Sequence, residues 1–159
     1  MNLKFKNRMH HYAGNLQRGQ SLFELVVAIA ISALMIVAMV SLATNSIKNS
    51  NFSKNKALAS SYAQEATEWL RGRRDNDYGA FNTNVLAAQG VKRCLNSLTW
   101  PIGIAPCSAG SITDTPFQRS VLFTIDDVEN VIYADITVSW SDSGGLHTVT
   151  SATNFSDWR

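Results

Sequence analysis

The chain has 159 residues, of which 16% are charged, and its formal net charge is +2. That length suits one domain with a modest core. Residues 1–19 carry four Lys or Arg and no acidic residue, so the rest of the chain sums to −2. Nucleic-acid binding needs a basic face on the folded body. The charge distribution therefore argues against that class of function, and no nucleic-acid partner is expected.

Residues 1–19 form a polar, basic leader that ends in Gly19. An ordinary secretory signal peptide has an apolar stretch before its cleavage site, and this leader has none. Its basic residues are typical of a segment that sets membrane orientation. His10 and His11 are interpreted as part of this solvated tip and not as a metal site.

An apolar stretch, residues 22–43, follows the leader, and within it only Glu24, Ser32 and Ser41 are polar. About 20 apolar residues cross a bilayer as a helix. The stretch contains no Pro or Gly that would interrupt one. It therefore predicts a transmembrane helix in contact with membrane lipid.

Apolar residues beyond this stretch keep helical spacings of three and four. They form two adjacent columns: Leu58, Tyr62, Ala66 and Trp69, and Ala59, Ala63, Ala66 and Leu70. Such spacing places them on one helix face. It predicts a helix from Ser21 to about Asn76 whose second half packs on the rest of the domain. The run from Arg71 to Asp75 is interpreted as an inter-subunit salt-bridge patch or as a solvated helix end.

Residues 77–118 contain all three prolines and both cysteines, and we expect an irregular loop there. Cys94 and Cys107 lie in no cluster with metal-ligand spacing, so no metal site is expected. No base or cationic site that would activate a thiolate is evident near them. If this part of the chain is exported, a Cys94–Cys107 disulfide is favoured over two free, buried thiols. In the chain-entropy model it would contribute about 3 kcal/mol.

The C-terminal part has the pattern of strands. Ser120–Ile125 is rich in β-branched and aromatic residues, and Val131–Trp140 alternates apolar and polar side chains. Leu146–Thr153 follows a Ser-Asp-Ser-Gly-Gly turn. Three antiparallel strands with one apolar face would cover the amphipathic half of the helix. His147, alone on the last strand, is interpreted as a surface residue.

The leader joins the apolar stretch through Gly19-Gln20-Ser21-Leu22-Phe23-Glu24-Leu25. A basic leader that ends in Gly, followed by a lone Glu inside an uninterrupted apolar helix, resembles the motif of the type IV prepilin family. The resemblance implies cleavage between Gly19 and Gln20 by a prepilin peptidase and N-methylation of Gln20. Glu24 would be the fifth mature residue. The first mature residue of the family is usually Phe or Met, and Gln20 departs from this.

The position of Glu24 has a physical rationale. A carboxylate in hydrocarbon costs several kcal/mol unless it is paired. Cleavage would create a positive amine at Gln20, one helical turn away, that can neutralise Glu24 of the same or a neighbouring subunit. Glu24 is therefore a candidate assembly and registration residue. Head-to-tail contacts that do not close produce a helical filament, with residues 22–43 in its core.

The segment Ala63–Tyr78 resembles the helix end of minor pilins of the pilus-modification, PilV-like branch. Together the resemblances imply an α+β, pilin-like fold with a long N-terminal transmembrane helix packed on a small antiparallel sheet. They divide the chain into a cleaved leader (1–19), a transmembrane and filament-core half-helix (20–43) and an extracytoplasmic domain (44–159).

The expected function is that of a structural minor pilin, a single-pass inner-membrane protein that is assembled into a type IV pilus-type filament. Its partners would be the prepilin peptidase, other pilin subunits, the inner-membrane assembly platform and lipid. No cofactor and no catalytic residue is expected. The alternatives are a pseudopilin of a type II secretion system, a pilus-tip adhesin or DNA-uptake module that binds through the Cys94–Cys107 loop and Trp100, and a membrane-anchored domain that never assembles.

Overall fold

The structure is a computed structural model that describes residues 20–100, 107, 110–126 and 128–157. The predicted leader, including Gly19, lies outside these residues. Two compact units make up the chain, residues 1–48 and residues 49–159.

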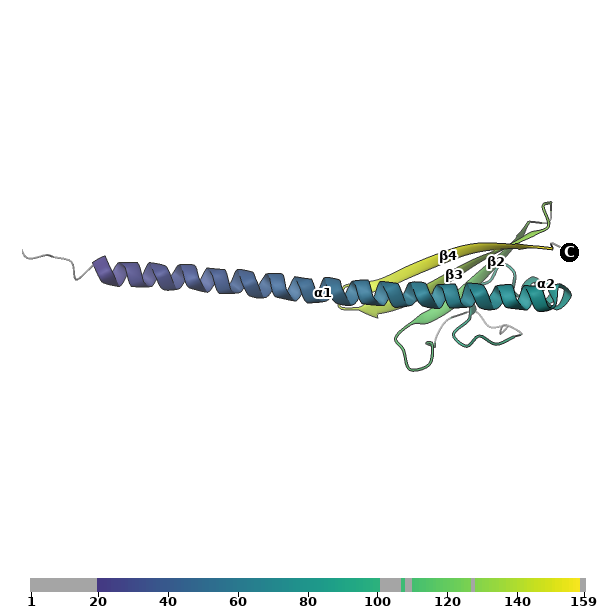
Figure 1. Cartoon of the computed structure of the whole chain (residues 1–159), viewed down its shortest axis with the longest axis horizontal. Helices are drawn as coiled ribbons and strands as arrows, with labels where there is room; N and C mark the ends of the chain where they lie inside the picture. Colours follow the sequence, from purple (N-terminus) through teal and green to yellow (C-terminus); the bar gives the residue numbers. More distant parts are fainter. Residues whose placement is uncertain (1–19, 101–106, 108–109, 127, 158–159) are drawn as a thin grey trace, which may run out of the picture. The chain divides into compact units, whose positions relative to one another are not determined.

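Figure 1 shows a long helix, a short helix and a sheet. The helices are α1 (Gln20–Asn76) and α2 (Tyr78–Ala88). The strands are β1 (Arg93–Cys94), β2 (Gln118–Asp126), β3 (Val131–Asp142) and β4 (Gly145–Ser156). Neighbouring strands pair antiparallel in the order β1-β2-β3-β4. The predicted α+β, pilin-like arrangement, a long N-terminal helix on an antiparallel sheet, is confirmed.

The described part of the first unit is the beginning of α1. It belongs to the one helix, among the residues described, that is long and apolar enough to cross a membrane. The hydroxyls of Ser32 and Thr44 donate to the carbonyl oxygens of Ala28 and Val40, at 2.8 and 2.9 Å. These hydroxyls are therefore satisfied within the helix and do not interrupt its apolar character.

In the second unit, α1 packs on one face of the sheet. Its buried face is formed by Ala59, Ala63, Ala66 and Leu70, each at most 1% exposed. The facing residues of β3 are at most 2% exposed: Ile132, Ala134, Ile136, Val138 and Trp140. The predicted helix end and strand alternation are confirmed, whereas Leu58, at 39% exposure, lies outside the core.

Residues 77–118 are not wholly irregular, because they contain α2 and β1. Asp77 is the N-cap of α2, and its Oδ1 accepts a hydrogen bond from the N–H of Ala80 at 3.0 Å. Phe81, Val85 and Ala88 bury one face of this helix. The Gly, Thr and Asn residues of α2 are poor helix formers, so capping and packing decide the outcome. With β1, the sheet has four strands and not the three predicted.

The predicted disulfide between Cys94 and Cys107 is present, with Cα atoms 4.5 Å apart. Cys94 is the last residue of β1. The backbone N–H of Cys107 donates to the carbonyl of Lys92 at 2.8 Å. The bridge therefore fastens the loop to the β1 side of the sheet.

Arg119 of β2 connects the sheet to α1 and is only 2% exposed. Its Nη1 donates to the carbonyl of Tyr62 at 2.9 Å and to Oε2 of Glu65 at 2.7 Å. Its Nε donates to the carbonyl of Leu95 at 2.8 Å, and its Nη2 to that of Asn96 at 3.4 Å. A guanidinium holds several acceptors in a fixed geometry, so Arg119 fixes the helix against the sheet. No local sequence pattern predicts this role of Arg119.

Candidate functional site

The predicted processing site lies at the start of α1. The helix begins at Gln20, the residue directly after Gly19. Glu24 lies one turn further on, and its side chain is exposed. Gly19 and the side chain of Gln20 lie outside what the structure describes, so the cleavage and methylation of this junction remain predictions.

Glu24 lies in an apolar segment. Its neighbours Phe23 and Leu25 are 70% and 60% exposed. No ion pair involves Glu24 within residues 20–100, 107, 110–126 and 128–157. Glu24 lies beyond the first turn of α1, which contains no acidic residue, so the unpaired N–H groups and the helix dipole of that turn give its carboxylate little stabilisation. In hydrocarbon, this carboxylate would therefore need a positive partner.

The described residues of the chain leave the apolar surface of α1 uncovered in the first unit. Every large apolar side chain from Leu22 to Leu42 is at least 37% exposed. Soluble monomers rarely expose a continuous apolar surface of this extent. This surface therefore marks a contact with lipid or with other proteins.

A second cluster of polar and aromatic side chains lies where β3 turns into β4. Nε2 of His147 lies 2.9 Å from Oδ1 of Asp142. The His147 ring lies edge-on to Phe52 of α1 and beside Trp140 of β3, with centroid distances of 5.1 and 5.3 Å. The prediction of an isolated surface histidine is wrong, because His147 joins the hairpin to the helix. The Asp five residues earlier, across a Gly-Gly turn, was the signal that could have indicated this pair.

Local contacts stabilise the charged form of Asp142. The backbone N–H of Gly144 and the side chain of His147 hold the pKa of Asp142 below its ordinary value. In the part of the chain that the structure describes, no group of three or more His, Cys, Asp or Glu could hold a metal. The Asp142–His147 pair is suited to holding the hairpin against the helix.

The arginine run at the end of α1 has partners within the chain. Arg71 pairs with Glu68 at 2.6 Å and Arg74 pairs with Asp75 at 2.7 Å. The guanidinium of Arg74 also lies 5.7 Å from the ring centroid of Phe155. These local contacts favour the interpretation of a solvated helix end over that of an inter-subunit patch.

Trp100, the aromatic residue of the disulfide loop, packs inside the domain. Its ring stacks on Phe81 of α2 with centroids 5.7 Å apart, and lies edge-on to Trp69 of α1 at 5.5 Å. This packing explains the residue without a ligand. Residues 101–106 of the loop lie outside the described residues.

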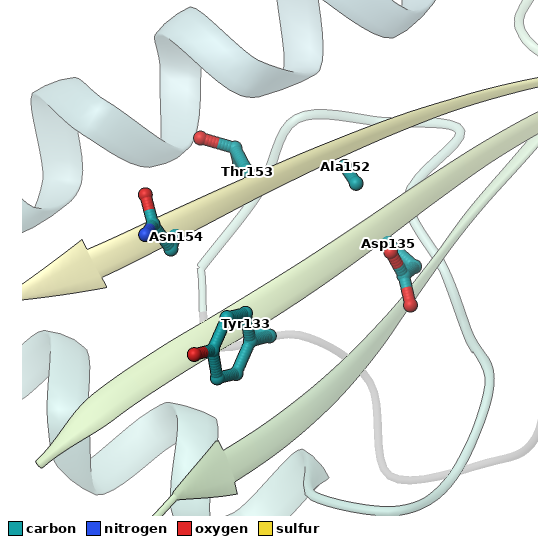
Figure 2. A pocket seen from close by; sticks show the side chains of 5 residues that line it. All are labelled: Tyr133, Asp135, Ala152, Thr153 and Asn154. Carbon is teal, nitrogen blue, oxygen red and sulfur yellow. The ribbon is translucent and has the colours of Figure 1, made fainter. Parts of the chain in front are cut away.

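A shallow, open hollow lies on the side of β3 and β4 that faces away from the core (Figure 2). Its volume is about 250 Å³, and it is lined by Tyr133, Asp135, Ala152, Thr153 and Asn154. In the strand register, Tyr133 lies opposite Asn154 and Asp135 lies opposite Ala152. A phenol, a carboxylate and an amide therefore border the hollow beside a small alanine. No local sequence pattern predicts this hollow, because its residues come from two paired strands.

Residues 14–40 match the family model for the prokaryotic N-terminal methylation motif. The match includes the predicted cleavage junction, Glu24 and most of the apolar stretch. Neither the curated proteins nor the solved structures that were compared contain a match to the chain. A motif of this kind at the head of an apolar, membrane-type helix supports a type IV prepilin-like protein.

Proposed function

We propose that the chain is a structural minor pilin, cut by a prepilin peptidase between Gly19 and Gln20 and methylated on Gln20. Residues 20–43 hold it in the inner membrane, with residues 44–159 outside the cytoplasm, until it enters a type IV pilus-type filament. The observation that carries this proposal is the methylation motif, which contains one acidic residue, Glu24, within an apolar helix.

Glu24 contributes an ion pair that guides assembly, formed between its carboxylate and the amine of Gln20. In the membrane its charge is costly, by roughly 2.5 to 3.5 kcal/mol on insertion scales for an acidic residue at the helix centre, and less near the end. The new amine at Gln20 removes most of this cost when it lies beside the carboxylate. A subunit that enters the filament brings its Glu24 to the amine of a subunit already in place, so only one longitudinal position satisfies both charges.

The exposed apolar surface from Leu22 to Leu42 holds the subunits of the filament together through apolar packing. In the membrane it faces lipid, and in the filament it packs against the equivalent helices of other subunits. Ser32 and Thr44 do not hinder this packing because their hydroxyls are already satisfied within α1. The role is structural, and the peptidase acts on this chain as its substrate.

Low-copy status rests on the resemblance of Ala63–Tyr78 to minor pilins. A pseudopilin of a type II secretion system would carry the same motif and helix. The two functions differ in their output, so a deletion strain separates them. Loss of surface filaments with normal protein export supports the pilus, and loss of export supports the secretion system. The tip-binding alternative is weakened by the packing of Trp100 on Phe81 and Trp69.

The proposed function is tested by the substitution Glu24→Ala in the full chain, with Ser32→Ala as a matched control in the same apolar stretch. We expect Glu24→Ala to lower the amount of the protein in sheared filaments by at least about tenfold, since 1.4 kcal/mol of lost pairing gives that factor. Ser32→Ala should leave it within about twofold. Equal incorporation of Glu24→Ala and the unmodified chain would contradict the proposal.

A further inference from the structure

The two outer sides of the β2-β3-β4 sheet differ in whether another segment pairs with them. The free edge of β2 is covered by the segment after α2: Arg93 pairs with Val121, and Cys94 pairs with Ser120. Beside these pairs, the N–H of Gly90 donates to the carbonyl of Phe123 at 3.0 Å. The other edge is β4, and within the described parts of the chain no segment pairs with its outer side.

In the described residues, the open edge of β4 lacks the charged residues, prolines and bulges that often protect an exposed edge. Proteins block an exposed edge with Lys residues, prolines, bulges or very short strands. The strand Gly145–Ser156 has the sequence GLHTVTSATNFS, with no Asp, Glu, Lys, Arg or Pro. It pairs with β3 without a bulge through twelve consecutive residue pairs. Its outward N–H and C=O groups therefore form a long, regular row that matches another extended backbone.

The hollow of Figure 2 lies next to this edge. Ala152 of β4 lies opposite Asp135 of β3. A strand added to β4 would lie about 10 Å from β3, which is two strand spacings. Because Ala152 has only a methyl group, a long side chain from the added strand can cross β4 there and reach the exposed carboxylate of Asp135.

We propose that the open edge of β4 binds an extended segment of a different pilin-like subunit, which places a Lys or Arg side chain over Ala152 onto Asp135. Hydrogen bonds to the outward N–H and C=O groups of β4 provide affinity, and the hollow beside Ala152 selects for a long cationic side chain, as in other cases of strand addition. This inference rests on the proposed function, because it assumes that other subunits lie alongside this one in the filament.

The β4 strand of a second copy of this chain fits the edge poorly. Phe52 contacts His147 near the start of β4, and Arg74 lies over Phe155 near its end, so the packed half of α1 and β4 run in the same chain direction. An antiparallel β4–β4 pair needs a twofold axis that reverses one copy, and copies arranged head to tail in one filament are not related in that way. Parallel β4–β4 pairing would need a twofold axis along the strands, and this rotation turns one of the two sheets over. Equivalent residues of the two strands would then point to opposite faces, so the side chains of paired residues would not lie on the same face. A strand from a different subunit has neither restriction.

The test places a photo-crosslinking amino acid at Thr150 on β4 of the full chain, in cells that assemble filaments. Thr124 on β2, which is also exposed, is the matched control position. We expect Thr150 alone to form an adduct, and mass spectrometry to identify its partner as a different pilin-like subunit. An adduct between two copies of this chain, or equal adducts from both positions, would overturn the proposal.

Three substitutions extend the test. Ala152→Lys fills the hollow and puts a charge on the edge, so it should lower the Thr150 adduct by about tenfold, whereas Thr124→Lys should change it by less than about twofold. Asp135→Asn should lower it by about two- to fivefold, the value of one exposed ion pair. An unchanged adduct yield with Ala152→Lys would overturn the proposal. If methylated Gln20 is found in filaments but no Thr150 adduct forms, the proposed function stands and the edge contact fails.

Discussion

The two halves of α1 differ in what stabilises them. From Leu22 to Leu42 every large apolar side chain is exposed. From Ala59 to Leu70 the helix buries a narrow column of small residues on its own sheet. Among the described residues, the first of these parts of α1 has no covering partner and the second packs on the sheet. The first part therefore presents an apolar surface to lipid or to other proteins, and only the second part contributes to the core of the domain.

The largest effect is expected from removing the side chain that joins the packed half of α1 to the sheet. Arg119→Ala should lower the free energy of unfolding of the domain by about 3 kcal/mol, because it removes a buried side chain and leaves the buried carbonyl of Leu95 without its side-chain donor. The carbonyl of Tyr62, which lies within α1, loses only its second donor. Urea unfolding of the full chain in detergent, followed by tryptophan fluorescence, measures this loss.

The ion pair itself explains little of that value, since Glu65 is 54% exposed. Glu65→Gln is therefore the control and should cost less than about 1 kcal/mol. If Glu65→Gln were as damaging as Arg119→Ala, the assignment of Arg119 to the buried carbonyls would be wrong.

An intermediate effect is expected from the same substitution made in each half of α1. Ala63→Leu places a larger side chain where the helix meets the sheet, and overpacking should destabilise the domain by about 1 to 3 kcal/mol. Ala30→Leu, in the exposed half, should leave the unfolding of the domain unchanged. The same urea experiment compares them, and equal effects on domain unfolding would remove the distinction between the two halves.

The smallest effect is expected at the hairpin that contacts Phe52. A carboxyl whose pKa is depressed in the folded state stabilises the fold above its unfolded pKa, and this contribution is lost as the pH falls through the folded pKa. For Asp142 the loss begins below about pH 4. Asp142→Asn should therefore flatten the decline of unfolding temperature in acid, and His147→Gln should reproduce part of that change. An identical acid decline in all three proteins would show that the pair has no influence.

Much of the fold follows from local sequence patterns. The absence of Pro and Gly, the spacing of Ala59, Ala63, Ala66 and Leu70, and the alternation of β3 predict α1, its buried face and the inner face of the sheet. The cysteine pair also predicts the disulfide, because the rest of the chain offers no metal-ligand pattern around it. These features can be predicted because the spacing of apolar residues and the local composition determine them directly.

Other features depend on contacts between distant parts of the chain. Helix α2 forms from weak helix formers because Asp77 caps it and its apolar face is buried. Arg119 reaches Tyr62, 57 residues away in the chain, and His147 reaches Phe52 across the helix and hairpin. No local spacing encodes these pairs. The motif around Glu24 differs from these pairs, because all of its residues lie close together in the sequence and can be recognised from the sequence alone.

We propose that the chain is processed by a prepilin peptidase before it is assembled. Mass spectrometry of the N-terminal peptide, from protein isolated out of cells with an active prepilin peptidase, tests it most directly. We predict a peptide that begins at Gln20 and carries one methyl group on its amine. A protein that keeps residues 1–19 under those conditions would contradict the claim, because Glu24 would then have no new amine to pair with.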